Sequence, residues 1–319
     1  MLYLEELLDA VIAEEGQTLM GLEFLIDTLG LSMSKIDTLF KKALSEYSER
    51  RPMKKTTVIN NFDYADPEAG YITMPEGTTS CRIARYGVLP NQMPRYYMPK
   101  FGEQNVEFDR YTLQCRVWPP VTPLRLTYTQ RFVPTTNILI EKMIEIPYTT
   151  DEFDFSLPTY YAGKSLSIQK SVIVTKESGE VTSEILSMAP TGYINQVTDG
   201  EGFVEEAVLK GTLGSGTVNL KTREVKLELS NDTPSPILIN YYPKYSVVKE
   251  LDIGNYLFTK IFACKILQAL AALRAQATQE NLHNLDLTTD RLLDRVAELK
   301  KEINDQSRSA ISFADMAPQ

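Results

Sequence analysis

The chain has 319 residues, of which 43% are hydrophobic and 24% charged, which is typical of a soluble globular protein with one large domain or two ordinary ones. The formal net charge of −9 argues against nucleic-acid binding by the whole surface, but it is compatible with a duct through which DNA slides. The three cysteines lack metal-ligand spacing, the N-terminus lacks a signal-peptide pattern, and no apolar run approaches the ~18 residues of a membrane span. These features predict assembly in a reducing cytoplasm.

The first 55 residues are predicted to form an N-terminal helical module. Apolar spacing predicts helices at 2–13 and 19–29, each followed by a glycine stop. A third helix follows Ser34, which forms a predicted capping box with Asp37. Its apolar stripe contains Ile36, Leu39, Phe40, Ala43, Leu44 and Tyr47. Pro52 is expected to end this helix.

Residues 56–248 are predicted to form a mostly antiparallel, sandwich-like β domain. Alternating or β-branched runs predict strands at 56–59, 71–74, 81–86, 124–129, 138–140, 142–146, 166–174 and 237–242. The clearest hairpin lies within 211–229, where two alternating runs flank a polar turn. Within this domain, residues 87–123 contain six prolines and predict an extended arm, or long loops with short edge strands.

Residues 249–319 are predicted to form a C-terminal helical hairpin and tail. Residues 251–279 carry the longest helical signal in the chain and are apolar nearly all round, so this helix must be covered by other elements. Residues 287–303 predict a second helix with a narrower apolar stripe. The predicted fold class is therefore α+β, with a β domain between N-terminal and C-terminal helices.

No candidate for catalysis, cofactor binding or metal binding survives inspection of the sequence. The single histidine, His283, has no nucleophile motif beside it, and the glycines at 163 and 211–216 lack the context of a phosphate or dinucleotide loop. The acidic run 151–154 does not match a calcium loop and is interpreted as a solvated turn. We therefore expect a protein that is not an enzyme and has no cofactor.

One cluster has the composition of a contact surface. Between Arg82 and Arg131 there are seven arginines and one lysine against three acids, interleaved with aromatic residues. Arginine with aromatics can stack on unpaired bases, but it also marks protein–protein contacts. An acidic protein partner is the favoured interpretation. The candidate contact residues are Arg82, Arg85, Arg95, Tyr96, Tyr97, Lys100 and Arg110, together with Arg50 and Arg51 at the end of the third helix.

The phrase Ala-Leu-Ser-Glu-Tyr-Ser-Glu-Arg-Arg-Pro at 43–52, followed by a strand, resembles virion proteins of tailed bacteriophages. Their neck, head-completion and connector proteins open with a helical module that ends in a similar phrase and then enter a β domain. The stretches 241–245, 250–252 and 256–263 are similar in style to the late helices of such proteins. The specific match covers about 30 residues.

The resemblance implies a structural protein of the virion neck, assembled in the host cytoplasm as a homo-oligomeric ring. Such a ring has twelve copies on the portal side or six on the tail side. Its partners would be further copies of itself, a portal or adaptor protein, and a tail terminator or other tail protein. DNA would pass through the lumen without sequence-specific binding, and no membrane would be involved.

Other functions remain open at this stage. The arm and the large hairpin region are compatible with a baseplate or tail-attachment subunit of the same structural class. A carbohydrate-active β domain would use paired carboxylates, and the aromatics of the arm are the only feature that favours it, since no such pair can be nominated. A nucleic-acid-binding β domain is the remaining alternative.

Overall fold

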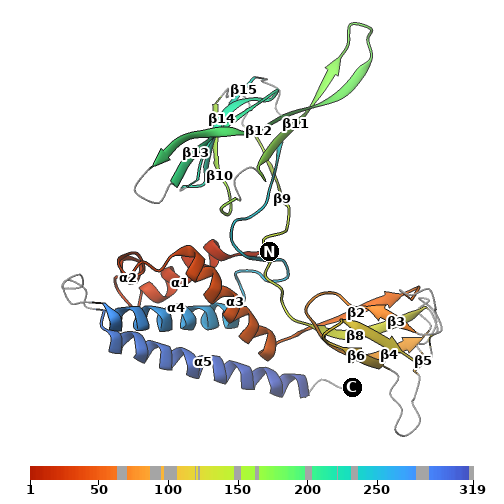
Figure 1. The fold of residues 1–319 in the computed structure, drawn as a ribbon, viewed down its shortest axis with the longest axis vertical. Helices are drawn as coiled ribbons and strands as arrows, with labels where there is room; N and C mark the ends of the chain where they lie inside the picture. Colours follow the sequence, from red (N-terminus) through yellow and green to blue (C-terminus); the bar gives the residue numbers. More distant parts are fainter. Residues whose placement is uncertain are drawn as a thin grey trace. The chain divides into compact units, whose positions relative to one another are not determined.

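The computed structural model describes residues 1–62, 70–86, 95–96, 106–118, 120, 123–146, 152–161, 165–197, 203–220, 222–230, 236–277 and 287–315. Within these ranges the side chains of 82–86, 95–96, 192–197, 203–205 and 307–315 are outside the description. The chain contains helices at both ends of the sequence and antiparallel strands between them, which confirms the α+β class (Figure 1).

The chain divides into two compact units, and each unit is built from two separate segments. Unit 1 comprises Met1–Gln17 and Thr135–Ile253, and unit 2 comprises Thr18–Pro134 and Gly254–Gln319. The sequence prediction instead placed three consecutive domains at 1–55, 56–248 and 249–319. Residues of the predicted β domain occur in both units, because periodicity identifies elements but not which elements pack together.

Unit 1 contains an eight-stranded antiparallel sheet in the order β10-β15-β14-β13-β12-β11-β16-β9. The predicted hairpin within 211–229 is confirmed as β14–β15, in which Val218 is paired with Val225. The strands are β9 (Ile140–Ile144), β10 (Glu152–Ser156), β11 (Ser167–Thr175), β12 (Val181–Val197), β13 (Phe203–Gly211), β14 (Gly214–Asn219), β15 (Glu224–Leu229) and β16 (Ile237–Tyr241).

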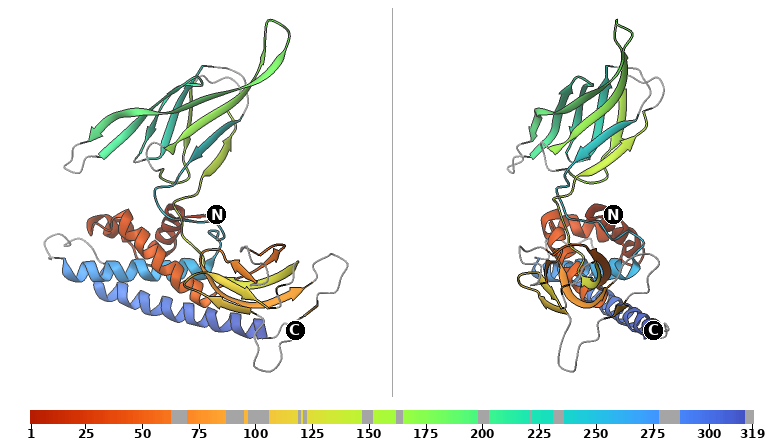
Figure 2. Two further views of the ribbon diagram at one scale, coloured as in Figure 1. Left: turned by 45° about the vertical axis from the view of Figure 1, so that its right-hand side comes forward. Right: turned by 90° about the vertical axis from the view of Figure 1, so that its right-hand side faces the viewer.

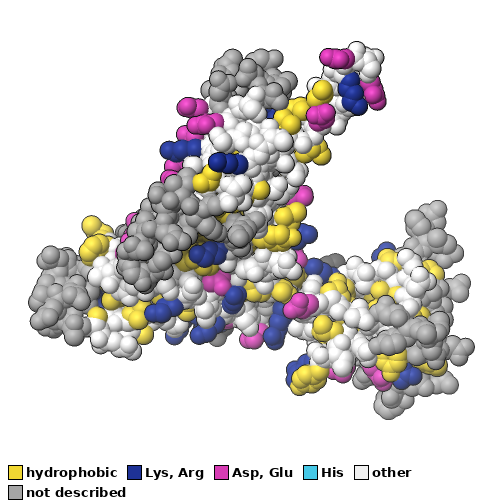
Figure 3. Space-filling view, turned by 45° about the horizontal axis from the view of Figure 1, so that its top comes forward, with side chains coloured by type: hydrophobic (Ala, Val, Ile, Leu, Met, Phe, Trp, Pro, Cys, Tyr) yellow, Lys and Arg dark blue, Asp and Glu magenta, His cyan; other side chains and the backbone are white. Residues whose placement is uncertain are grey.

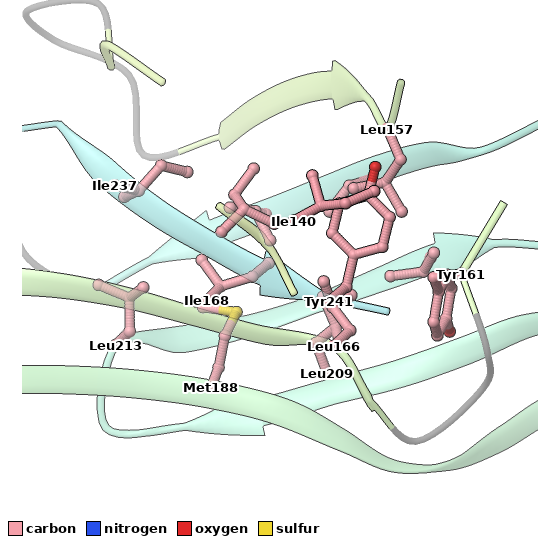
Figure 4. Packing of buried hydrophobic residues seen from close by; sticks show 14 of the residues in the cluster. Ile140, Leu157, Tyr161, Leu166, Ile168, Met188, Leu209, Leu213, Ile237 and Tyr241 are labelled. Atoms are coloured by element: carbon pink, nitrogen blue, oxygen red, sulfur yellow. The ribbon is translucent and has the colours of Figure 1, made fainter. Parts of the chain in front are cut away.

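The core of unit 1 lies on one face of this sheet. Ile140 from edge strand β9 and Leu157 just after edge strand β10 belong to the same buried cluster as Leu209 and Tyr241 from inner strands (Figure 4). Strands at opposite ends of the order can share one cluster only if the sheet bends, as expected from the twist of strands. The sheet therefore encloses its own core.

The N-terminus is built into unit 1. Strand β1 (Leu2–Tyr3) pairs with β17 (Val247–Val248), so Leu2 is opposite Val248. Helix α1 (Leu4–Gly16) follows at once and carries Glu5, whose carboxylate accepts hydrogen bonds from the loop after β10. These contacts connect the first residues of the chain to residues more than 150 positions away.

Unit 2 contains the remaining helices: α2 (Leu22–Thr28), α3 (Met33–Arg50), α4 (Tyr256–Gln276) and α5 (Thr289–Asp315). Phe40 of α3 is fully buried and packs edge-to-face on Phe258 and Phe262 of α4, with ring centroids 5.6 and 5.8 Å apart. Helices α4 and α5 lie side by side (Figure 2). The predicted stripe of the third helix is thus the face that packs on the long apolar helix.

The predicted capping box at Ser34 and Asp37 is wrong. The Ile36 N–H donates to the carbonyl of Ser32 at 3.0 Å, so the helix starts earlier and Ser34 lies within its first turn. The Ser34 carbonyl accepts from the Thr38 hydroxyl, and the Asp37 carboxylate pairs with Lys41 at 2.6 Å. The Asp37 side chain is therefore used along the helix and not at its end. The stop before Pro52 is confirmed.

Helix α4 is the one helix of the described chain that is long and apolar enough to cross a membrane by length and composition, but 67% of that window is buried. Its Lys260 is buried and pairs with Glu302 of α5 at 3.4 Å. A paired cation and a buried apolar face are the features of a core helix.

Unit 2 also contains two small sheets, in the orders β2-β8-β4-β5 and β3-β7-β6. Their facing sides share one buried cluster, which includes Ile72, Cys81, Cys115 and Leu126, so the sheets form a small sandwich. The described part of segment 87–123 contributes three short strands to it. The strands are β2 (Met53–Ile59), β3 (Tyr71–Thr73), β4 (Thr78–Tyr86), β5 (Arg95–Tyr96), β6 (Val106–Asp109), β7 (Gln114–Val117) and β8 (Leu124–Gln130).

Candidate protein-contact surface

The turn between β6 and β7, residues 109–113, is closed by its own hydrogen bonds and is named here the β6–β7 tip. The Asp109 carboxylate accepts from the Tyr111 N–H and from the Thr112 hydroxyl, both at 2.9 Å. Leu113 adopts a φ of 55°, and its carbonyl accepts from the Met74 N–H at 2.8 Å. The hydrogen bonds favour the charged form and lower the pKa of the Asp109 carboxyl. The tip is therefore held in one conformation at neutral pH.

This tip presents Arg110 and Tyr111 together. The Arg110 guanidinium carbon lies 5.0 Å from the centroid of the Tyr111 ring, and its Nη2 is 3.0 Å from the Tyr111 hydroxyl. Tyr111 is 83% exposed. Arginine and tyrosine are the side chains that most often dominate the binding energy of protein interfaces. Because the turn holds the backbone of both residues, little backbone conformational entropy would be lost when a partner binds.

A second group of basic residues lies on the four-stranded sheet. Arg125 on β8 is exposed and is paired with Val58 of β2 on one side and with Arg85 of β4 on the other. Arg85 is in turn paired with Tyr96 of β5. The register thus places the predicted residues Arg85 and Tyr96 in strands next to Arg125. Lys54, exposed on β2, adds a further cation to this sheet.

For the other contact residues predicted between Arg82 and Arg131 the structure describes only the backbone position, or no position. Arg82 lies at a register shift of β4 between Cys81 and Ile83, and Arg95 is paired with Tyr86. The side chains of Arg82, Arg85, Arg95 and Tyr96 are outside the description, and Tyr97 and Lys100 lie entirely outside the described residues.

The two arginines at the end of α3 have different surroundings. Arg50 is engaged within unit 2: its guanidinium binds Glu46 at 3.0 Å and the Asn304 side chain at 3.3 Å. Arg51, the residue after the helix, is exposed.

Arg50 belongs to a polar network between three helices. Lys265 of α4 also pairs with Glu46, at 2.7 Å, beside a cavity of about 180 Å³ lined in addition by Cys264 and Lys300. Burial opposes ionisation of Glu46, but the hydrogen bonds and charges of Lys265 and Arg50 outweigh it and lower the pKa of this carboxyl. The network joins α3, α4 and α5, which is a structural role.

Three residues of the cluster from Arg82 to Arg131 were not among the predicted contact residues, although the structure places them on the surface. Arg125 is exposed, Arg116 lies with its guanidinium 5.7 Å from the Tyr71 ring centroid, and Trp118 is half-exposed. The alternation of the strands at 114–117 and 124–130 places Arg116 and Arg125 opposite the buried positions. That alternation is the signal that could have found both arginines.

Unit 1 contains a buried carboxylate that the sequence did not suggest. Glu5 is 4% exposed, and one of its oxygens accepts from the Thr159 hydroxyl at 2.8 Å and from the Tyr160 N–H at 3.2 Å. Burial raises the pKa of this carboxyl, although its hydrogen bonds oppose the shift. Because both donors come from one loop, Glu5 anchors α1 to the sheet.

The residues considered for metal binding or catalysis do not form such a site in the described part of the structure. Among the residues that the structure describes, no group of three or more histidine, cysteine or acidic side chains could hold a metal ion. Glu152 and Asp154 are exposed on strand β10, so the predicted acidic turn is wrong for these two residues, which pair with β15. His283 lies outside the described residues.

Comparisons of the chain with protein-family models, with curated proteins and with solved structures returned no match.

Proposed function

We propose that this chain is a structural virion protein that forms a homo-oligomeric ring at the neck of a tailed bacteriophage, between the portal of the DNA-filled head and the tail. The observation that carries the proposal is the passage from helix to strand at 43–52. Helix α3 ends at Arg50, Pro52 follows, and β2 begins at Met53. This order matches the helical module and β domain that phage neck proteins share.

The exposed basic and aromatic side chains of unit 2 support a contact with an acidic protein. The β6–β7 tip holds Arg110 and Tyr111 in a fixed pair, and Lys54 and Arg125 are exposed on the four-stranded sheet. In a chain of net charge −9, such local cations favour a specific partner surface over general attraction to DNA. The partner would be a portal, adaptor or tail protein, and the role requires neither a cofactor nor catalysis.

The test is electron microscopy of a lysate from the phage that encodes this chain, with its gene deleted. A neck protein is needed only after heads have filled and tails have been built, so we expect filled heads and complete tails that are not joined. A plasmid copy of the gene should restore joined particles, which excludes an effect on neighbouring genes.

Two other outcomes contradict the proposal. Heads joined to tails that lack only a baseplate would replace the neck with the baseplate or tail-attachment position. Normal infectious particles would exclude both positions.

A further inference from the structure

Two of the cysteines lie together in the small sandwich of unit 2. Cys81 on β4 belongs to the four-stranded sheet, and Cys115 on β7 belongs to the three-stranded sheet. Both side chains are part of the buried cluster that the two sheets share, where Cys81 is 8% and Cys115 0% exposed. The two thiols are hydrogen-bonded to each other within this core. Strands from different sheets thus bring two sulfur atoms into contact.

The strands around the pair hold both cysteines in place. In the strand register Cys81 is opposite Tyr128 of β8, whose side chain belongs to the same buried cluster. Cys115 is opposite Ile72 of β3 on one side and Phe108 of β6 on the other. Cys115 therefore lies on the central strand of its sheet, between two partners. The chemistry that two such adjacent thiols share is the interconversion of a dithiol and a disulfide.

The two thiols differ in reactivity. The hydrogen bond from Cys115 stabilises the Cys81 thiolate and lowers the pKa of this thiol, while burial opposes the shift. The same hydrogen bond and burial raise the pKa of Cys115. The thiolate is the nucleophile in thiol chemistry. Because Cys81 is also the more exposed of the two, it is the sulfur that reacts first, and Cys115 keeps its proton beside it.

We infer that Cys81 and Cys115 are a site of reversible oxidation, at which hydrogen peroxide converts the two thiols into a disulfide that joins β4 to β7. The Cys81 thiolate attacks one peroxide oxygen, the O–O bond breaks, and hydroxide leaves, so that Cys81 becomes a sulfenic acid. The Cys115 sulfur then attacks the Cys81 sulfur, and the S–OH bond breaks. The departing hydroxide takes up the Cys115 proton and leaves as water. The two sulfurs lose two electrons, and the peroxide gains them as it becomes water.

The disulfide holds the two ends of the segment that carries the candidate contact surface. Between the two cysteines lie β5, β6 and the β6–β7 tip with Arg110 and Tyr111. A cross-link restricts the unfolded chain and so stabilises the fold around it. Disulfides also join the two packed sheets of immunoglobulin domains, so such a bond is compatible with a sandwich. The inference does not rest on the proposed neck function, because the thiols belong to the chain itself.

The first test counts the free thiols of the purified full chain under denaturing conditions, before and after treatment with hydrogen peroxide. The reduced chain should show three thiols and the oxidised chain one, with a loss of about 2 Da from the mass of the chain. A dithiol reductant should restore all three. Three thiols after the treatment, or a disulfide between two chains on a non-reducing gel, would overturn the inference.

The matched control is Cys264→Ala. Cys264 lies on α4 and lines the cavity between the helices, so this variant should still lose both of its remaining thiols. Cys81→Ala and Cys115→Ala should form no disulfide within the chain. Peptide mapping of the oxidised wild type gives the same information without a substitution: one linked pair of peptides should contain residues 81 and 115. A link that includes Cys264 would overturn the assignment.

The second test identifies the sulfur that attacks the peroxide. Dimedone traps sulfenic acids, and in Cys115→Ala it should label Cys81. In Cys81→Ala it should label Cys115 at least about tenfold more slowly, because that thiol is fully buried. Equal labelling of the two would contradict the assigned order of attack. All of these readouts use the purified chain, so failure of the disulfide and failure of the neck function can be told apart.

Discussion

The β6–β7 tip and the β11–β12 arm, residues 171–185, both belong to antiparallel hairpins, but they expose opposite chemistry. The β6–β7 tip is short, charged and closed by the Asp109 carboxylate, with Arg110 stacked on Tyr111. The β11–β12 arm is long and exposes the aliphatic side chains of Ile173, Val181 and Ile185. Figure 3 shows hydrophobic side chains along this arm and charged ones at its tip. The same backbone topology thus supports two kinds of contact, and the exposed side chains determine which one each hairpin can make.

Exposed side chains in the two units therefore favour different kinds of contact. A fixed arginine and tyrosine favour a partner of opposite charge, and this contact should weaken as salt increases. Exposed aliphatic side chains favour a contact that buries apolar area, and such a contact depends little on salt. Both interpretations require that the exposed residues contribute little to folding.

The largest expected effect is on stability, and it differs between substitutions of two aromatic residues of unit 2. Phe40→Ala should lower the free energy of unfolding by about 3–5 kcal/mol, because the ring is fully buried against Phe258 and Phe262. Tyr111→Ala should cost less than about 1 kcal/mol, since only an exposed cation–π contact and an exposed hydrogen bond with Arg110 are lost. Denaturant unfolding of both variants measures the contrast, and equal losses would mean that the β6–β7 tip is part of the fold.

The second largest expected effect is also on stability, and it differs between substitutions of two isoleucines on strand β11 of unit 1. Ile168→Ala should cost about 2–5 kcal/mol, because Ile168 is fully buried in the core of the sheet. Ile173→Ala, on the opposite face of β11, should change the free energy of unfolding by no more than about 0.5 kcal/mol, because Ile173 is exposed. Denaturant unfolding of both variants tests this, and a large loss for Ile173→Ala would show that its side chain contributes to the fold.

The smallest expected effect concerns pH and Glu5. The folded pKa of Glu5 is raised by burial, so its contribution to stability is present below the unfolded value of 4.5 and is lost as pH rises through the folded pKa. Glu5→Gln keeps an acceptor for Thr159 and removes the charge. At neutral pH the variant should be at least as stable as the wild type, by an amount of the order of 1 kcal/mol.

The Glu5→Gln advantage should shrink as pH falls through the folded pKa of Glu5 and should be gone below 4.5. Thermal unfolding over a pH series measures this difference. The assigned role of Glu5 would be contradicted if Glu5→Gln were less stable than the wild type at neutral pH and if the difference in their unfolding free energies narrowed at alkaline pH.

The sequence predicted those parts of the fold in which one face of an element is buried. The stripe of Phe40 and Tyr47 located helix α3, and strict alternation located β14 and β15, because both patterns arise from a single buried face. Strand β12 was missed: it contains Pro190 and Gly192 at a register shift and exposes Ile185 where an apolar residue suggests the core. Its form depends on neighbouring strands and not on its own pattern.

The candidate surface was predictable in composition but not in arrangement. The cluster from Arg82 to Arg131 contains Arg110, yet its stacking on Tyr111 depends on the turn that Asp109 closes. Arg85, Arg125 and Tyr96 lie on neighbouring strands because of the strand order of the sheet, which cannot be predicted from sequence spacing. The same holds for Glu5 and Thr159, which meet only because α1 folds onto the distant sheet.

In the proposed function, the charged β6–β7 tip joins this protein to another virion component. The most direct test complements the gene-deleted phage with Arg110→Glu and, as a matched charge reversal, with Lys35→Glu on the exposed first turn of α3. Filled heads without tails are then counted by electron microscopy. We expect Arg110→Glu to leave heads and tails separate while Lys35→Glu restores joined particles, because only the former brings like charges together at the contact. Joined particles with Arg110→Glu in the same proportion as with the control would contradict the claim.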